Sequence, residues 1–327
     1  MSAPNDAPQS ELRSALDQRS KRRRIGLIAG IGAAALIAGG AVVAVNLAGA
    51  GEATADVAAA GDTVHLKVAS SGESSLNDAV QEVAAEHGVE IEWVNFTDDW
   101  TLPNTALVAG EVDANAFQHS AFLSAFNTEN DAELVPVVST VIVEWGIFSS
   151  KLTDLDELPD GARIVIPDDP ANGGRALGIL AAAGLIEVDP AAGIYPTPDD
   201  VTDNPKGLEF VPIKALTIPQ QLDDPTVDAV VVGTSYFDPS QGITAEDALY
   251  LDDALADNSL PYVNFIATTP ERADDAVWET LREVYQDPRV QAGLDEDSHG
   301  ASVIVDLDPA KLQDKLTELE DFARANG

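Results

Sequence analysis

The sequence predicts an α/β protein made of two lobes that are joined by two crossing strands. From Val64 onward, short runs of β-forming residues alternate with stretches of helical character. Such strand–helix–strand units build mainly parallel sheets with helices on both faces. Two further β-rich runs, Val138–Ser149 and Tyr262–Thr268, have no helix of their own after them. A chain of this length divides such material into two lobes, and these runs are the predicted crossings.

The first lobe is expected to begin with three strand–helix units. Its strands are predicted at Val64–Ala69, Ile91–Phe96 and Asp113–Phe117. The helices after them are predicted at Leu76–His87, at Pro103–Val108 and from Gln118 onward. Helices at Glu271–Tyr285 and Pro309–Ala325 complete this lobe, which comprises residues 64–144 and 265–327.

The second lobe is expected to comprise residues 145–264, including the crossing strands. Its strands are predicted at Arg163–Pro167, Leu208–Pro212 and Ala229–Val232, each with a helical stretch after it. In two such lobes the carboxyl ends of the strands face a common cleft, where ligands of these sheets bind.

The N-terminal region carries a membrane signal. No charged residue lies between Ile25 and Gly51, and Lys21–Arg24 are all basic. About 20 apolar residues span a bilayer, and a basic cluster stays in the cytoplasm. We therefore expect a cytoplasmic tail at 1–24, a single-pass anchor at 25–48, a linker at 49–63 and an extracytoplasmic domain at the cell membrane. A cleavable signal ending near Ala48–Ala50 is the alternative, and it also exports the domain.

The composition of the exported part excludes several classes of function. The chain has no cysteine, so disulfides, thiolate metal sites and cysteine nucleophiles are absent. From Gly51 onward, 12 Lys and Arg stand against 53 Asp and Glu, a formal charge of −41. Such a surface repels nucleic acid and anionic lipid, so neither is an expected partner of the domain.

Catalytic and cofactor motifs are scarce. The sequence has no nucleophile elbow, no zinc-protease motif, no P-loop and no dinucleotide fingerprint. His65, His87 and His299 have no metal-ligating residue at usable spacing. We expect no enzyme, no metal and no cofactor, and the rival reading of a hydrolase or lyase depends only on the abundance of carboxylates.

The strongest candidate for ligand binding is the segment Asp168–Arg175. It follows the predicted strand Arg163–Pro167 and opens a helix, with Pro170 at the turn and Asn172 as the predicted N-cap. A helix N-terminus attracts an anion, and Arg175 adds a guanidinium whose fork matches a carboxylate. The alternative is a surface arginine paired with Asp168 or Asp169.

Aromatic residues form a second candidate at another strand-to-helix junction. Phe117 and Phe122 are expected to wall an apolar side-chain pocket with His119 at its mouth, and Trp100 and Trp145 are further possible walls. Ordinary core packing explains the same pattern about as well.

Asn264 is the third candidate. It is a polar residue inside the apolar run Tyr262–Ile266, so its amide needs a partner in the backbone or in a ligand.

Six stretches follow one another in order through nearly the whole exported domain: Gly110–His119, Asp154–Ala162, Asp169–Leu177, Asn204–Leu208, Gln221–Asp224 and Pro261–Asn264. Together they resemble the NlpA/MetQ family, the substrate-binding proteins of methionine ABC importers.

The resemblance implies a type II periplasmic-binding-protein fold that closes on a free amino acid, chiefly methionine, and delivers it to a permease with an ATPase subunit. It implies that Arg175 holds the ligand carboxylate and that Asn264 helps to hold the amino-acid backbone. Phe117, His119 and Phe122 would surround the thioether, which suits the contacts that sulfur makes with aromatic edges.

The sequence also departs from that family. Gly233 stands where the family usually has a ligand-contacting Asn, so Thr234 or Ser235 would have to replace the contact. Phe122 replaces a Tyr, and Glu144 could pair with a ligand ammonium group. The lipid-bearing cysteine is absent, and the predicted anchor would replace it. Because Gly233 makes room, a dipeptide or another apolar amino acid is the alternative ligand.

Overall fold

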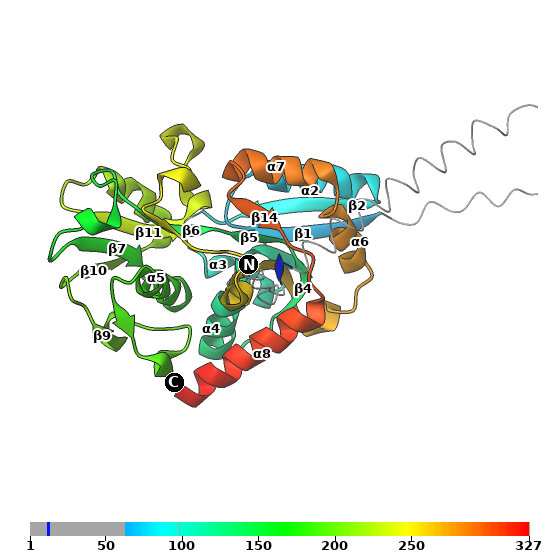
Figure 1. The fold of residues 1–327 in the computed structure, drawn as a ribbon. Helices are drawn as coiled ribbons and strands as arrows, with labels where there is room; N and C mark the ends of the chain where they lie inside the picture. The colour runs from blue at the N-terminus through cyan, green and yellow to red at the C-terminus, as the bar shows by residue number, and fades with distance from the viewer. Residues whose placement is uncertain (1–11, 14–62, 98, 327) are drawn as a thin grey trace, which may run out of the picture.

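The computed structural model describes residues 12–13, 63–97 and 99–326, and its architecture consists of two five-stranded sheets with helices around them (Figure 1). The first sheet has the order β2-β1-β3-β13-β4. Its strands are β1 (Val64–Ser70), β2 (Val89–Asn95), β3 (Ala114–His119), β4 (Val135–Ser139) and β13 (Asn264–Thr268).

The second sheet has the order β10-β7-β11-β6-β12. Its strands are β6 (Trp145–Phe148), β7 (Arg163–Pro167), β10 (Glu209–Ile213), β11 (Ala229–Gly233) and β12 (Tyr250–Leu251). Residues 145–251 thus supply all five strands of this sheet, and the chain returns to the first sheet at β13. Two short pairs, β14 (Ser302–Ile304) with β5 (Val141–Val143) and β8 (Glu187–Val188) with β9 (Val201–Asp203), complete the strands.

Both sheets are mixed, so the prediction of mainly parallel sheets was right only in part. In the first sheet β1 runs parallel to β2 and β3, whereas β13 runs antiparallel to β3 and β4. In the second sheet β7 runs parallel to β10 and β11, whereas β6 runs antiparallel to β11 and β12. Every antiparallel pair in these two sheets involves β6 or β13, and neither of these strands follows an α-helical crossover.

Helices cover both sheets. Around the first sheet lie α2 (Ser75–Glu86), α3 (Leu102–Val108), α4 (Ser120–Asn130), α6 (Val277–Val284), α7 (Pro288–Ser298) and α8 (Pro309–Asn326). Helix α5 (Pro170–Ala182) packs on the second sheet through β7. The helical stretches expected after β10 and β11 are 3₁₀ segments, Ala215–Asp223 and Thr234–Tyr236.

The strands of each sheet have apolar residues on both faces. Two apolar clusters surround the first sheet, one with Trp278 and Tyr285 and one with Phe126 and Phe265. Two more surround the second sheet, one with Trp145 and one with Phe148. Burial on both faces explains the near-continuous apolar runs, such as Ala229–Gly233, from which the strands are predictable.

The two crossing segments lie side by side. One passes from β4 through β5 into β6, and the other enters β13. Thr140 N–H donates to the carbonyl oxygen of Asn264 at 2.8 Å, which joins them directly. The residues at this junction are therefore shared between the two sheets.

The tail, anchor and linker predicted at 1–63 fall almost wholly outside the described residues. Within the described part of the chain, no helix is long and apolar enough to cross a membrane. Two tail residues are described: Leu12 is buried in a cluster with Leu107 and Phe265, and Arg13 pairs with Asp253 at 2.5 Å. A spanning segment at 25–48 would place this tail on the side opposite the domain, so that contact and the predicted anchor are incompatible within one molecule.

Candidate ligand-binding site

A cavity of about 350 Å³ lies between the two sheets, at the carboxyl ends of their strands. Residues after β1, β3 and β11 line it, together with the first turns of α5. Clefts at these strand ends are where α/β sheets bind ligands. Of the predicted site residues, eight line the cavity: Trp100, Phe117, His119, Phe122, Trp145, Arg175, Ser235 and Asn264.

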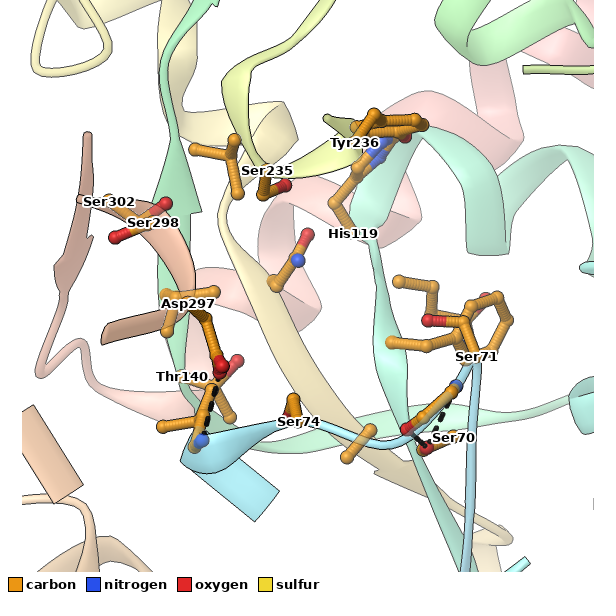
Figure 2. A pocket seen from close by; sticks show the side chains of 18 of the residues that line it. Ser70, Ser71, Ser74, His119, Thr140, Ser235, Tyr236, Asp297, Ser298 and Ser302 are labelled. Carbon is orange, nitrogen blue, oxygen red and sulfur yellow. Dashed lines mark hydrogen bonds between the residues drawn. The ribbon is translucent and has the colours of Figure 1, made fainter. Parts of the chain in front are cut away.

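Figure 2 shows two chemically different ends of this cavity. His119, Ser235 and Tyr236 lie at one end, and Ser70, Ser74, Thr140 and Asp297 lie at the other. We call the first the aromatic end and define it by these residues: Trp100, Phe117, His119, Phe122, Trp145, Arg175, Tyr236 and Tyr262. We call the second the polar end and define it by these: Ser70, Ser71, Ser74, Asn77, Thr140, Asp297, Ser298 and Ser302.

Arg175 is a buried cation at the aromatic end. Its Nη2 donates to the Val143 carbonyl oxygen and to Asp252 Oδ2, both at 2.9 Å. Its guanidinium carbon lies 4.7 Å from the Trp145 ring centroid and 4.5 Å from that of Tyr262. Its Nε is buried without a partner in the described part of the chain. Since both hydrogens of Nη2 are engaged, Nε and Nη1 are the donors left for a ligand anion.

The glycines before Arg175 allow close packing around it. A Cβ at Gly173 would lie 2.8 Å from the Pro167 carbonyl oxygen, and one at Gly174 would lie 2.5 Å from that of Ile194. The helix can therefore sit directly on β7 and under the loop at 194–196. Its N-cap is Asp169, whose side chain accepts from Asn172 N–H, so the prediction of Asn172 as N-cap was wrong. Burial raises the pKa of Asp169.

His119 is neutral and bridges the two sheets. It is the N-cap of α4, where its Nδ1 accepts from Phe122 N–H at 3.2 Å. Nε2 therefore carries the hydrogen and donates to Asn172 Oδ1 at 3.2 Å. Burial, followed by the charge of Arg175, lowers the pKa of His119 to about 3. The side chain acts as a fixed donor between α4 and α5.

The aromatic rings form a continuous wall. Trp100 contacts both Phe122 and Tyr236, with ring centroids 6.4 and 5.4 Å apart, and Tyr236 contacts Trp145 at 5.6 Å. The remaining contacts are edge-on too: Phe117 with Phe122, and His119 with Phe122 and Tyr262. Because Trp100 and Tyr236 come from opposite sides of the cavity, the wall closes across it.

Two predicted residues do not line the cavity, namely Gly233 and Glu144. A Cβ at Gly233 would lie 2.8 Å from Trp145 Nε1 and 2.9 Å from the Tyr236 ring, so Trp145 and Tyr236 fill the space expected to be free there. The Glu144 carbonyl oxygen accepts from the N–H and Oγ1 of Thr234. Burial and the nearby Asp252 and Asp253 raise the pKa of the Glu144 carboxyl group.

The polar end was not predicted. Asp297, on α7, accepts from the N–H groups of Ser75 and Leu76 at 2.9 Å and so caps helix α2. Ser298 Oγ donates to the Leu294 carbonyl oxygen. Ser302 Oγ is buried without a partner in the described region. Sequence analysis missed α7, although Asp287 and Pro288 form an ordinary N-cap and N1 pair that signals its start.

The two sides also touch outside the cavity. Tyr195 Oη lies 2.5 Å from Ser124 Oγ on α4, and the Tyr195 ring packs on Phe322 of α8. The carboxyl end of α8 accordingly lies beside the chain that leads into β9 (Figure 1). Together with the His119–Asn172 bond, these contacts join the two sides of the cavity. The described residues contain no group of His, Asp and Glu placed to hold a metal ion.

Comparisons with known proteins agree with this geometry. A family model described as NlpA lipoprotein matches residues 64–305. The D-methionine-binding lipoprotein MetQ of Salmonella typhimurium is 34% identical over 245 residues, which cover 74% of this chain and 89% of that protein.

Solved structures are similar as well. A nutrient binding protein from Burkholderia cenocepacia bound to methionine matches with a TM-score of 0.67 and 32% identity, over 73% of this chain and 99% of that one. The substrate binding protein of a methionine transporter from Streptococcus pneumoniae matches with a TM-score of 0.66 and 29% identity, over 74% of this chain and 95% of that one. The mixed α/β fold is thus that of transporter substrate-binding proteins.

Proposed function

This chain belongs to the NlpA lipoprotein family, and from that membership and the geometry of the cavity we propose that it is the substrate-binding protein of an ABC importer. Its ligand is a free amino acid, with methionine as the first candidate, because relatives and structural neighbours are named for methionine. The partners are a permease and its ATPase. The role needs no catalytic group.

The observation that carries this proposal is the setting of Arg175. A buried guanidinium with Nε unpartnered lies at the first turns of a helix and faces a cavity walled by aromatic rings. A ligand carboxylate would take the free donors on Nε and Nη1. Phe117, Phe122 and Trp100 offer ring edges to a thioether. Asn264, which pairs with His119 in the sheet register, also lines the cavity.

Closure is the second part of the proposal. The lobes are residues 64–144 with 265–327, and residues 145–264, and they move about the crossing segments near Thr140 and Asn264. Ligand favours the closed lobes because it contacts both sides of the cavity only in that arrangement. The contacts of His119 with Asn172 and of Tyr195 with Ser124 span the two lobes, so they would break on opening.

Membrane attachment is the third part. The relatives are named lipoproteins, whereas this chain has no cysteine to carry a lipid. The apolar segment 25–48 would serve as a single-pass anchor instead, and in that topology the contacts of Leu12 and Arg13 with the domain would not form. Replacing Ala35 and Leu36 with lysines should release the domain from the membrane fraction of the cell. Retention of the doubly substituted protein in that fraction would count against the anchor.

The test of the function is calorimetric titration of amino acids into protein from which any carried-over ligand has been removed. We expect saturable binding of methionine with micromolar or tighter affinity. If neither methionine nor any other small amino acid binds, the proposed function is wrong.

A changed ligand is the second candidate, and the polar end favours it. The cavity continues past the aromatic end to Ser74, Asp297 and Ser302, which a single methionine held by Arg175 need not fill. A dipeptide or another amino acid would use this space. Mass spectrometry of the ligand that remains bound through purification distinguishes these possibilities from methionine.

A further inference from the structure

We propose that Asp252 makes the site selective for zwitterions, by cancelling the charge of Arg175 from behind the cavity. This inference rests on the proposed function, because it concerns the charge of the ligand that Arg175 holds. Asp252 does not line the cavity, so it acts on a ligand without touching it. Its negative charge acts through the ion pair with Arg175 and through its electric field.

Asp252 is held rigidly in place. Its Oδ1 accepts from the N–H of Trp145 at 2.8 Å, and its own N–H donates to the Trp145 carbonyl oxygen at 2.8 Å. The preceding strand β12 pairs with β6, where a Cβ at Gly146 would lie 2.8 Å from the Tyr250 carbonyl oxygen. Glycine at 146 therefore lets the segment approach closely enough for Asp252 to reach Arg175.

The Arg175–Asp252 pair is an enclosed pair of opposite charges. The two side chains are 4% and 17% exposed, and Nη2 lies 2.9 Å from Oδ2. Solvent screens such a pair much less than a surface pair, so its net charge matters to anything that enters the cavity. That net charge is zero.

The other ionisable groups near the cavity do not restore a net positive charge. His119 is neutral. Asp297 is compensated by two N–H groups at the start of α2, and Asp169 caps the start of α5. Glu73 is exposed to solvent, and Asp253 is exposed and paired with Arg13. Burial and the neighbouring Asp252 and Asp253 raise the pKa of Glu144, and any charge that it carries opposes an anion as Asp252 does.

A neutral pair favours a neutral ligand. A zwitterionic amino acid enters without adding net charge, whereas a carboxylate that lacks an ammonium group adds one uncompensated negative charge. An uncompensated charge in an enclosed site is strongly unfavourable. Without Asp252 the site would carry a net positive charge and would prefer anions. Asp252 is thus a specificity-determining residue that rejects the deaminated relatives of the ligand.

Asp252→Asn is the informative substitution. Asparagine keeps the shape but has one oxygen for two donors, Arg175 Nη2 and Trp145 N–H, so it removes both the charge and one hydrogen bond. Three ligands are titrated: methionine, its analogue with hydrogen in place of the ammonium group, and its carboxamide. They are a zwitterion, an anion and a cation with the same side chain.

The readout is the ratio of affinities within each protein. A change in folding stability or in lobe closure affects all three ligands on one variant and cancels in the ratio. We expect Asp252→Asn to shift the methionine-to-anion ratio toward the anion by at least about tenfold, and the methionine-to-cation ratio in the opposite direction. Asp252→Glu, which keeps the charge, should retain the original ratios.

Asp253→Asn is the matched control. Asp253 is adjacent in sequence, its side chain is 55% exposed, and it makes no contact with Arg175. Its ratios should equal those of the unmodified protein. If Asp252→Asn does not fold, Asp252→Ala provides a second neutral variant.

The outcomes separate this inference from the proposed function. Two outcomes would show that Asp252 does not set the selectivity, provided that the unmodified protein binds methionine. In the first, the affinity ratios of the neutral variants equal those of the unmodified protein. In the second, the anion binds neither to the unmodified protein nor to any variant. If the unmodified protein binds no amino acid, the proposed function itself is wrong.

Discussion

The two ends of the cavity differ in how their polar atoms are satisfied. At the aromatic end, His119 is bonded through both ring nitrogens, but Arg175 has a buried Nε with no partner in the described chain. At the polar end, Asp297 and Ser298 are bonded to backbone groups, and the buried Ser302 Oγ, which has no partner in the described chain, is uncharged. A free, rigidly placed charge can hold a ligand, whereas side chains already used by the backbone hold the walls. The difference indicates that the aromatic end selects the chemical class of the ligand, and that the polar end limits the length of the ligand.

Removing the charge at the aromatic end should have the largest effect. Arg175→Met should lower the affinity for methionine by roughly 2–5 kcal/mol, because the ligand carboxylate loses a buried charged partner. Calorimetry measures this loss. Arg163→Met is the control, since Arg163 lies on β7 of the same sheet and bonds to Thr226. Comparable affinity in the two variants would mean that the aromatic end does not hold the ligand.

The second prediction concerns acid stability. The pKa of His119 is about 3 in the folded protein and 6.5 in the unfolded chain, so the unfolded state binds the extra proton between these values. Stability is unaffected above pH 6.5 and falls as the pH drops toward 3. At about pH 5 this contribution is roughly 2 kcal/mol, and His119→Gln should abolish it.

Urea unfolding at neutral pH and at about pH 5 measures the effect as a difference between the two proteins. His65→Gln is the control, because that ring is exposed and pairs with Glu90 at the surface. The same acid loss in the original protein and in His119→Gln would disprove the buried, neutral state of His119.

The third prediction tests the aromatic wall. Trp100→Leu removes the ring that contacts both Phe122 and Tyr236, and should weaken methionine binding by about 1–2 kcal/mol. Alanine, whose side chain does not reach the wall, should bind as before. Trp93→Leu is the control, because Trp93 is a partly buried tryptophan of β2 that packs on the cluster with Trp278 but does not line the cavity. An equal loss for both amino acids would point to closure of the lobes rather than to the side-chain pocket.

The smallest effect is expected at the polar end. Ser302 Oγ is buried without a partner in the described structure, so Ser302→Ala should raise the free energy of unfolding by up to about 1 kcal/mol. Ser298→Ala, which breaks the bond to Leu294, should lower it. Affinity for methionine should stay within about twofold in both, since neither bonds a ligand held by Arg175. Marked weakening in Ser302→Ala would extend the binding site into the polar end.

Local patterns predicted much of the fold. The strand Arg163–Pro167 has the predicted bounds, and α3 and β1 differ from theirs by one residue. These segments alternate clear β-forming runs with turn and cap residues. The antiparallel placement of β13, the pairing of β12 with β6 and the β5–β14 ribbon depend on partners far away in sequence. Local propensity carries no information about such partners.

The candidate site shows the same division. Phe117, His119, Phe122 and Arg175 were predictable because each lies where a strand ends and a helix begins. Tyr236, Tyr262 and Asp252 were missed, although Tyr236 follows the end of β11 and Tyr262 precedes β13. Gly233 was predicted to leave room for a ligand, but the side chains of Trp145 and Tyr236 occupy the space beside it.

The sequence by itself determined the alternation of strands and helices, the absence of thiol chemistry, the strongly acidic domain and the cation at the start of α5. These follow from residue type and short-range order. Only the tertiary structure decided that Arg175 faces a cavity between aromatic rings, that Asp252 stands behind it, and that His119 stays neutral. Burial and charge neighbours determine those properties, and both arise when segments about 50 to 140 residues apart come into contact.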